Sequence, residues 1–277
     1  SGGVDSVVML DMITKIGGLQ LIIAHFDHQI RGLESTRDAD FVRSLAKQYN
    51  LDYRIGFGKL GAHASEDQAR QARYRFLRSV AREVGGVICT AHHQDDLIET
   101  IALNLTRGTG WRGLAVFGAT DILRPLLGFT KQQLLTYARD RQLVWQEDST
   151  NSDQRYLRNR LRQRLRAKLS PTARELLIEL YQRQHRLAQT IRIECKRFYQ
   201  PSRRYQRYFW IMIDELAAQE LLNFILKKDF NVSLTRPQLQ YALVIIKTAR
   251  SNDLAQLGEG IEVRFSRQEF WFKRPAG

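Results

Sequence analysis

The chain has 277 residues, of which 43% are hydrophobic and 26% charged, enough apolar material for one or two domains with buried cores. Its formal net charge of +14 is divided as +1 over residues 1–150 and +13 over residues 151–277, so the second half is expected to hold a polyanion rather than to be basic for solubility alone. No apolar run reaches the roughly 20 residues of a membrane span, and only two cysteines are present, which excludes a disulfide framework and a zinc cluster and favours a cytoplasmic protein without a membrane partner.

In residues 1–150, apolar runs alternate with helical patterns. Buried strands are predicted at 19–26, 51–57 and 86–92. Helices are predicted from Ser35 or Thr36 to Tyr49, and over 65–84, 94–107 and 130–141. This alternation of strands and helices predicts an α/β fold, a Rossmann-like parallel sheet with helices on both faces.

A polar stretch at 146–156 marks the expected linker between a domain of residues 1–150 and a domain of residues 151–277. The second domain is predicted to be basic and mainly helical. Its expected elements are a largely helical region over 157–198 broken near Ser170 and Pro171, helices over 214–228 and 236–249, and a terminal hairpin at 261–274.

The chain opens on the glycine-rich sequence SGGVDS, residues 1–6. A glycine-rich turn at the start of a helix points backbone N–H groups at one spot, where the helix adds partial positive charge, so phosphate is the expected ligand. Asp5 would repel phosphate unless a cation lies between them, which favours a Mg²⁺-bridged pyrophosphate over an ordinary turn. The loop matches neither the Walker A pattern nor the dinucleotide pattern. Ligands of such sheets bind beyond the carboxyl ends of the strands, so a strand is expected before Ser1, and the chain is expected to be a fragment without it.

Two further polar clusters follow predicted strands. His25, Asp27, His28 and Arg31 lie at the end of the first run, where positioning of a nucleotide is favoured over a metal site or a solvated loop. The second cluster, HHQDDLIET at 92–100, places two or more carboxylates on one helix face if the helix begins near Gln94. Crowded carboxylates favour a bound cation, and the alternative is an acidic first turn that complements the helix dipole.

Arginines gather in three places. Arg70 and Arg73 share a predicted helix, and Arg107 and Arg112 flank flexible glycines, both arrangements suited to phosphate binding. The third place is a run without acidic residues between Asp153 and Glu175. A solvated helix face normally mixes charges of both signs, so this run favours a helix that faces nucleic-acid phosphates.

The opening loop resembles the PP-loop of the N-type ATP pyrophosphatases. Five later stretches follow in order and together resemble the tRNA(Ile)-lysidine synthase family: AHFDHQIRGLESTRDADFV (24–42), ARQARYRFL (69–77), TAHHQDDLIETIALNLTRGTGWRGLAVF (90–117), LRPLLGFTKQQLLTYA (123–138) and EDSTNSDQRYLRNRLR (147–162). The resemblance is dense over residues 1–170. It implies an adenine nucleotide alpha hydrolase-like fold and ATP-dependent conversion of the wobble cytidine of tRNA(Ile), anticodon CAU, into lysidine, with free L-lysine as the second substrate and AMP and pyrophosphate as products.

The resemblance also implies roles for individual residues. ATP is expected at Ser1, Gly2, Gly3, Val4, Asp5, Ser6, Asp27 and His28, with Mg²⁺ at Asp5. Catalysis is expected from Asp5, Asp96, Glu99 and Arg107, with Asp96 and Glu99 also holding lysine. Contacts with tRNA are expected from Arg31, Arg70, Arg73, Arg112, Arg155, Arg158, Asn159 and Arg162.

Leu97 departs from the family pattern, since it stands where the family has glutamine, and one hydrogen-bonding contact is lost. Two other hypotheses stay open: another PP-loop enzyme such as a tRNA thiolase, and a non-catalytic RNA-binding module with a decayed nucleotide site. The sequence does not decide the oligomeric state, a homodimer included.

Overall fold

The computed structural model describes residues 2–27, 33–58, 66–146, 161–162, 164–165, 168–200 and 204–274. The chain forms two compact units, residues 1–184 and residues 185–277, and each is described by itself. The division falls after Gln184, inside a helix. The expected linker lies almost wholly outside the described residues, so the assignment of separate ATP-binding and tRNA-binding domains at residue 150 stays a prediction. No helix in the described part of the chain is both long and apolar enough to cross a membrane.

The first unit is built on parallel strands. β1 (Ile22–Asp27) pairs with β2 (Asp52–Phe57), and β3 (Ile88–Cys89) pairs with β4 (Ile122–Leu123). Within the described residues these are two separate hydrogen-bonded pairs. The helices of this unit are α1 (Val4–Ile16), α2 (Leu33–Gln48), α3 (Glu66–Glu83), α4 (Gln94–Thr106), α5 (Trp111–Leu114), the 3₁₀ turn η1 (Pro125–Gly128) and α6 (Lys131–Asp140). The alternation of parallel strands and helices confirms the predicted Rossmann-like α/β class.

Local chemistry explains where the helices of this unit begin. His93 caps α4, and Thr130 caps α6 in a capping box completed by Gln133. The strand predicted at 86–92 is shorter than expected, because only Ile88 and Cys89 pair with β4 and polar residues follow at once.

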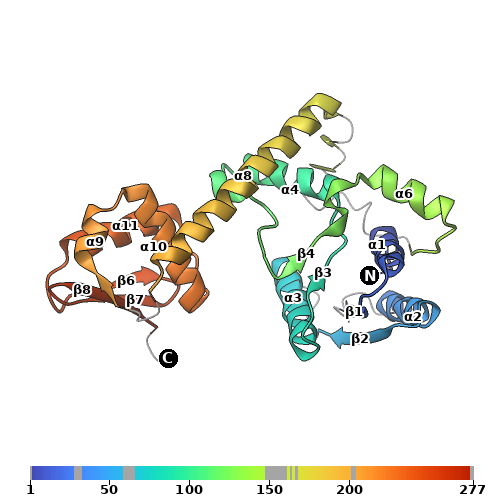
Figure 1. Ribbon diagram of the computed structural model, residues 1–277, viewed down its shortest axis with the longest axis horizontal. Helices are drawn as coiled ribbons and strands as arrows, with labels where there is room; N and C mark the ends of the chain where they lie inside the picture. The colour runs from blue at the N-terminus through green and yellow to red at the C-terminus, as the bar shows by residue number, and fades with distance from the viewer. Residues whose placement is uncertain are drawn as a thin grey trace. The chain divides into compact units, whose positions relative to one another are not determined.

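Helix α1 lies between α2 and α6 (Figure 1). Its apolar side packs Val4 and Val8 against Leu134 and Ala138 of α6. Its far end is fixed by Asp11, whose buried carboxylate accepts hydrogen bonds from the hydroxyls of Tyr137 at 2.7 Å and Tyr49 at 3.2 Å and from the Lys15 ammonium at 2.5 Å. A buried carboxylate with several donors is strongly held, so this contact fixes α1 against both neighbours.

The second unit combines helices with an antiparallel sheet. It contains the last part of α8 (Pro171–Phe198), then β5 (Tyr205–Gln206), α9 (Arg207–Met212), α10 (Glu215–Phe230), α11 (Arg236–Thr248), β6 (Leu254–Gly258), β7 (Ile261–Phe265) and β8 (Glu269–Lys273). The strand order is β5-β8-β7-β6, and α10 and α11 lie over one face of this sheet (Figure 1). Leucines and isoleucines of the two helices form one core with Trp210, Phe265 and Phe270. The helices predicted over 214–228 and 236–249, the hairpin, and the part of the 157–198 region after its break at Ser170 and Pro171 are confirmed, whereas β5, α9 and β6 were not predicted.

Candidate active site

The opening loop leads directly into α1. Gly3 is the residue that caps this helix, with φ −68° and ψ 154°, and it makes no side-chain cap hydrogen bond. A helix N-terminus without a side-chain cap keeps N–H donors for a ligand and carries partial positive charge. Gly2 is buried, and a Cβ atom there would lie 2.7 Å from Cδ1 of Phe41 and 2.9 Å from Oε1 of Gln146. The close approach explains why glycine is needed at position 2.

The first turn of α4 presents two acidic side chains, Asp95 and Asp96, and His93 fixes the turn. Nδ1 of His93 accepts a hydrogen bond from the backbone N–H of Asp95 at 3.2 Å, and Asp96 Oδ2 accepts one from the backbone N–H of His93 at 3.1 Å. Because Nδ1 accepts, the neutral ring carries its proton on Nε2. That nitrogen lies 3.7 Å from Asp5 Oδ2 and 3.5 Å from Asp96 Oδ2. The opening loop and the start of α4 therefore face the same imidazole ring.

Lys131, the first residue of α6, connects these two segments. Its ammonium donates to Asp5 Oδ1 at 2.7 Å, and its backbone N–H donates to Asp95 Oδ2 at 2.7 Å. The other oxygen of Asp95 accepts from Nη1 of Arg174 at 2.8 Å. Burial raises the pKa of Asp95, but the hydrogen bonds from Lys131 and Arg174 outweigh it, and the pKa is lowered from its usual value.

Glu99 lies one turn further along α4 and is 4% exposed. Arg162 binds it through two hydrogen bonds, Nε to Oε1 at 2.6 Å and Nη2 to Oε2 at 3.0 Å. The same guanidinium lies 3.9 Å from Asp96 Oδ1. The hydrogen bonds with Glu99 raise the pKa of Arg162 although burial lowers it. Such a bidentate pair is among the strongest that an arginine forms.

Every oxygen of the four carboxylates has a nitrogen of a neighbouring residue close to it. Each of the eight oxygens of Asp5, Asp95, Asp96 and Glu99 lies within 4.0 Å of a nitrogen of His93, Lys131, Arg162 or Arg174. Three cations thus balance most of the negative charge. No set of three or more His, Cys, Asp or Glu side chains among the described residues is arranged to hold a metal ion.

A basic and aromatic group adjoins this cluster through His92. Burial lowers the pKa of His92 to about 4, with Arg124, Arg70 and Arg73 acting in the same direction and Asp96 in the opposite one. Arg70 and Arg73 lie over the ring of Tyr74, with 5.2 and 5.4 Å to its centroid. These two predicted tRNA contacts lie on α3, close enough to His92 for their charges to lower its pKa.

Three other predicted site residues lie at other described positions. Arg107 is the exposed C-cap of α4, about 12 Å along the helix axis from Glu99 at 1.5 Å per residue. Arg112 is exposed on α5, 5.5 Å from the Trp111 ring centroid. Asp27 is buried at the carboxyl end of β1. Their roles stay predictions. Ser1, His28, Arg31, Arg155, Arg158 and Asn159 lie outside the described residues.

Sequence reasoning did not assign roles to His93, Lys131 and Arg174. His93 could have been found, because it precedes the acidic turn of α4 and histidine can accept a capping hydrogen bond. Lys131 and Arg174 follow Asp95 by 36 and 79 residues, and nothing in their local sequence connects them to it. Only the packing of α6 and α8 against α4 brings their charges there.

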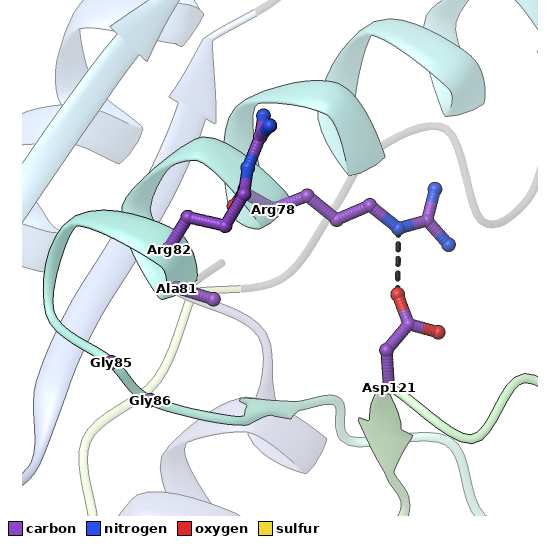
Figure 2. A pocket seen from close by; sticks show the side chains of 6 residues that line it. All are labelled: Arg78, Ala81, Arg82, Gly85, Gly86 and Asp121. Atoms are coloured by element: carbon purple, nitrogen blue, oxygen red, sulfur yellow. Dashed lines mark hydrogen bonds and ion pairs between the residues drawn. The ribbon is translucent and has the colours of Figure 1, made fainter.

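A hollow of about 560 Å³ lies elsewhere in the first unit, and it is not this site. Figure 2 shows Arg78 reaching across it to Asp121, with Gly85 and Gly86 along its edge. The Arg78 Nε to Asp121 Oδ2 distance is 2.6 Å. Gly86 precedes β3 and Asp121 precedes β4, so the hollow lies at the amino ends of these strands. The carboxylate cluster follows the carboxyl end of β3, where ligands of parallel sheets bind.

Comparison with known proteins decides the family. Residues 1–169 match the family model described as the PP-loop domain. The chain belongs to the PP-loop family. Membership implies ATP as the ligand, and SGGVDS stays the predicted PP-loop of this domain.

Curated relatives of this PP-loop chain include the tRNA(Ile)-lysidine synthase of Solibacter usitatus, 36% identical over 65% of this chain and 42% of that protein. The tRNA(Ile)-lysidine synthase of a Thermotoga species is 35% identical over 68% of this chain and 49% of that protein. The resemblance inferred from the sequence is confirmed, and the PP-loop chain spans less than half the length of these relatives. Among solved structures, a U34-tRNA thiolase from Methanococcus maripaludis matches with a TM-score of 0.56 and 21% identity, over 66% of this chain and 68% of that one. That likeness concerns the fold.

Proposed function

We propose that this chain carries the catalytic unit of an enzyme that makes lysidine: it adenylates the wobble cytidine of tRNA(Ile) with ATP and joins it to free L-lysine. The observation that carries the proposal is the meeting of the PP-loop with the acidic turn of α4 at one ring nitrogen of His93. One side can hold a polyphosphate and the other a cationic amine. The lysidine synthases among the relatives support this choice of substrates.

The PP-loop residues fit ATP. Gly2 lets the loop pack closely against Phe41, and the start of α1 has no side-chain cap, which leaves its N–H groups for phosphate oxygens. Asp5 fits Mg²⁺ as a single carboxylate, because Mg²⁺ is commonly bound by one or two carboxylates together with substrate phosphates and water. A Mg²⁺ ion held there would offset the negative charge of the phosphates.

The chemistry proceeds in two displacements. The ring carbonyl oxygen of cytosine attacks the α-phosphorus of ATP, the bond to the β-phosphate oxygen breaks, and pyrophosphate leaves. An uncharged amino group of lysine then attacks the ring carbon that bears the adenylated oxygen and loses its proton. The bond between this carbon and that oxygen breaks, and AMP leaves. The protein has to bind the polyphosphate, hold the ring and orient the amine.

Asp96 and Glu99 are the proposed carboxylates for the lysine substrate, and the geometry adds a condition. Both Glu99 oxygens are occupied by Arg162, which is itself a proposed tRNA contact. Neither residue can serve its substrate while they hold each other. We therefore infer that the pair opens during the reaction, and that tRNA phosphates, which compete for the guanidinium, favour the opening.

Arg70 and Arg73 are proposed to receive the anticodon on the other side of His92. His92 is neutral at physiological pH because its pKa lies near 4, so a pyrimidine ring can lie beside it without meeting a further positive charge. The basic residues 151–277 are proposed to bind the rest of the tRNA through its phosphates.

The test is incubation of the chain with ATP, lysine and tRNA(Ile) transcript, followed by mass spectrometry of the nucleosides and measurement of released pyrophosphate. Lysidine formed only when all three substrates are present would support the proposal. Pyrophosphate release without lysine incorporation would indicate a different PP-loop reaction. A thiolase is not favoured, because burial raises the pKa of Cys89 and the other cysteine, Cys195, is a buried core residue of the second unit.

A further inference from the structure

Lys131 lies within the family-resembling stretch of residues 123–138, and no role has been assigned to it above. It is the first residue of α6, its side chain is 27% exposed, and its ammonium lies 2.7 Å from the PP-loop carboxylate of Asp5. The helix does not need this side chain to begin, because Thr130 and Gln133 supply the capping hydrogen bonds. The lysine is therefore available for a role toward the loop.

The PP-loop has no cation of its own. The Walker A loop carries a lysine that reaches the β- and γ-phosphates of its nucleotide, whereas SGGVDS contains a carboxylate and no basic residue. A polyphosphate bound at the start of α1 would meet the charge of Asp5 unless positive charge is supplied from another segment. Lys131 can supply this charge, because its ammonium already donates a hydrogen bond to Asp5 of the loop.

The packing of α1 against α6 keeps the ammonium at the loop. Asp5 pairs with Lys131, and six residues further along both helices Asp11 pairs with Tyr137. Apolar residues of both helices are buried together between these two contacts. Because the apolar contacts and the Asp11–Tyr137 hydrogen bond do not involve the Lys131 side chain, the start of α6 stays beside the start of α1 whether or not that side chain moves.

We propose that Lys131 is a catalytic residue that binds the polyphosphate of ATP: its ammonium leaves Asp5 for a phosphate oxygen when nucleotide binds, and Asp5 becomes available to Mg²⁺. The proposal rests on the function proposed above. The four-carbon side chain of lysine allows such a change of partner without movement of the backbone. Lys131 thereby supplies from α6 the charge that a Walker A loop carries within its own sequence.

The experiment compares nucleotide binding by calorimetry for the 277-residue chain and three variants, with ATP and with AMP as ligands, each with and without Mg²⁺. Lys131→Met should weaken ATP binding at least tenfold and change AMP binding less than twofold, because AMP lacks the phosphates that the ammonium contacts. Lys131→Arg should recover most of the ATP affinity. Without its lysine competitor, Asp5 should also bind Mg²⁺ at lower concentration.

Lys15→Met is the matched control. It removes the same charge from the same helix pair and breaks a lysine–aspartate bond, that with Asp11, at the end away from the loop. Equal loss of ATP and AMP affinity in Lys131→Met, or equal losses in Lys131→Met and Lys15→Met, would reduce Lys131 to a structural role and overturn the inference. Unchanged ATP affinity in Lys131→Met would overturn it as well while leaving the proposed function intact. If the unsubstituted chain binds neither nucleotide, the proposed function fails first and the inference with it.

Discussion

Arg162 and Glu99 form a bidentate ion pair in which both carboxylate oxygens are occupied and the carboxylate is almost completely buried. Desolvation of two charges costs free energy that only good geometry offsets, so such a pair contributes little net stability. Removal of one partner is nevertheless strongly destabilising, because the other charge stays buried alone. This asymmetry makes the pair testable by substitution.

The first prediction concerns stability. Arg162→Met should lower the free energy of unfolding by about 3–5 kcal/mol, because Glu99 is left buried without its cation. The double variant Glu99→Met/Arg162→Met should regain most of that loss, since an apolar pair of similar volume needs no hydrogen bonds. Urea unfolding of both variants at pH 7 measures the difference. A single variant as stable as the parent chain would show that water reaches Glu99.

The second prediction concerns lysine. Glu99→Gln should raise the lysine concentration at half-maximal rate by about tenfold, because a charge-assisted hydrogen bond contributes roughly 1.5–3 kcal/mol and 1.4 kcal/mol is one decade. Pyrophosphate release in the presence of tRNA should survive better than lysidine formation. Measuring both steps in one preparation checks this. Equal loss of both steps with unchanged lysine dependence would assign Glu99 to holding Arg162 alone.

Much of this arrangement was predictable, and the reason differs between its parts. The PP-loop and the acidic turn of α4 are local patterns, so their site residues can be predicted from residues close together in the sequence. The partners of those carboxylates come from α6, α8 and Arg162, and the choice of partner is made by tertiary packing. Glu99 was expected to face a substrate cation, yet the cation it meets in the structure is Arg162.

The same distinction holds for the fold. The helices α10 and α11 were predicted nearly to the residue, because capping residues in the segments themselves, Asp214 and Thr235, mark where they begin. The two-residue strands β4 and β5 exist only through their partners, Ile88 and Cys89 for one and residues of β8 for the other. A pairing of this length leaves no pattern in the sequence.

The third prediction concerns tRNA binding. The logarithm of tRNA affinity should fall linearly with the logarithm of salt concentration, and neutralising Arg70 and Arg73 should reduce the slope by about one unit each. Arg54→Gln is the control, since Arg54 is exposed on β2 and pairs with Glu83. Filter binding at several salt concentrations gives the slopes. Identical slopes for the control and for the Arg70 variant would exclude a phosphate contact at Arg70.

The fourth prediction concerns pH. The pKa of His92 is near 4 in the folded chain and near 6.5 when unfolded, so the unfolded state binds more protons between these values. The contribution of His92 to stability should be complete above pH 6.5 and decline as the pH falls toward 4, by at most about 3 kcal/mol. Urea unfolding at pH 7 and pH 5 should show a smaller difference for His92→Asn than for the parent chain. The same difference in both would place the titration elsewhere.

The fifth prediction concerns the PP-loop backbone. Gly2→Ala should destabilise the loop by about 1–3 kcal/mol, because its methyl group would force Phe41 or Gln146 to move. ATP affinity should fall with it. Gly110→Ala serves as the control, since a Cβ atom at Gly110 meets no atom within 4 Å and the backbone has an ordinary φ of −76°. Thermal unfolding with and without ATP compares the two variants. Equal unfolding temperatures would mean that the Phe41 side chain can move aside without loss of stability.

The complete partnering of the four carboxylates has a consequence for how substrates arrive. At the oxygens that accept hydrogen bonds from Lys131, Arg162 and Arg174, a new cation can bind only where the resident nitrogen withdraws, so one positive charge replaces another and the net charge of the cluster changes little on loading. Selectivity then depends on where each displaced cation goes. Inorganic cations such as K⁺ carry no bound anion to receive Lys131 or Arg162, whereas the proposed substrates ATP and tRNA carry phosphates. Such a cluster is expected to bind a substrate cation only when a phosphate is also present to receive the displaced lysine or arginine.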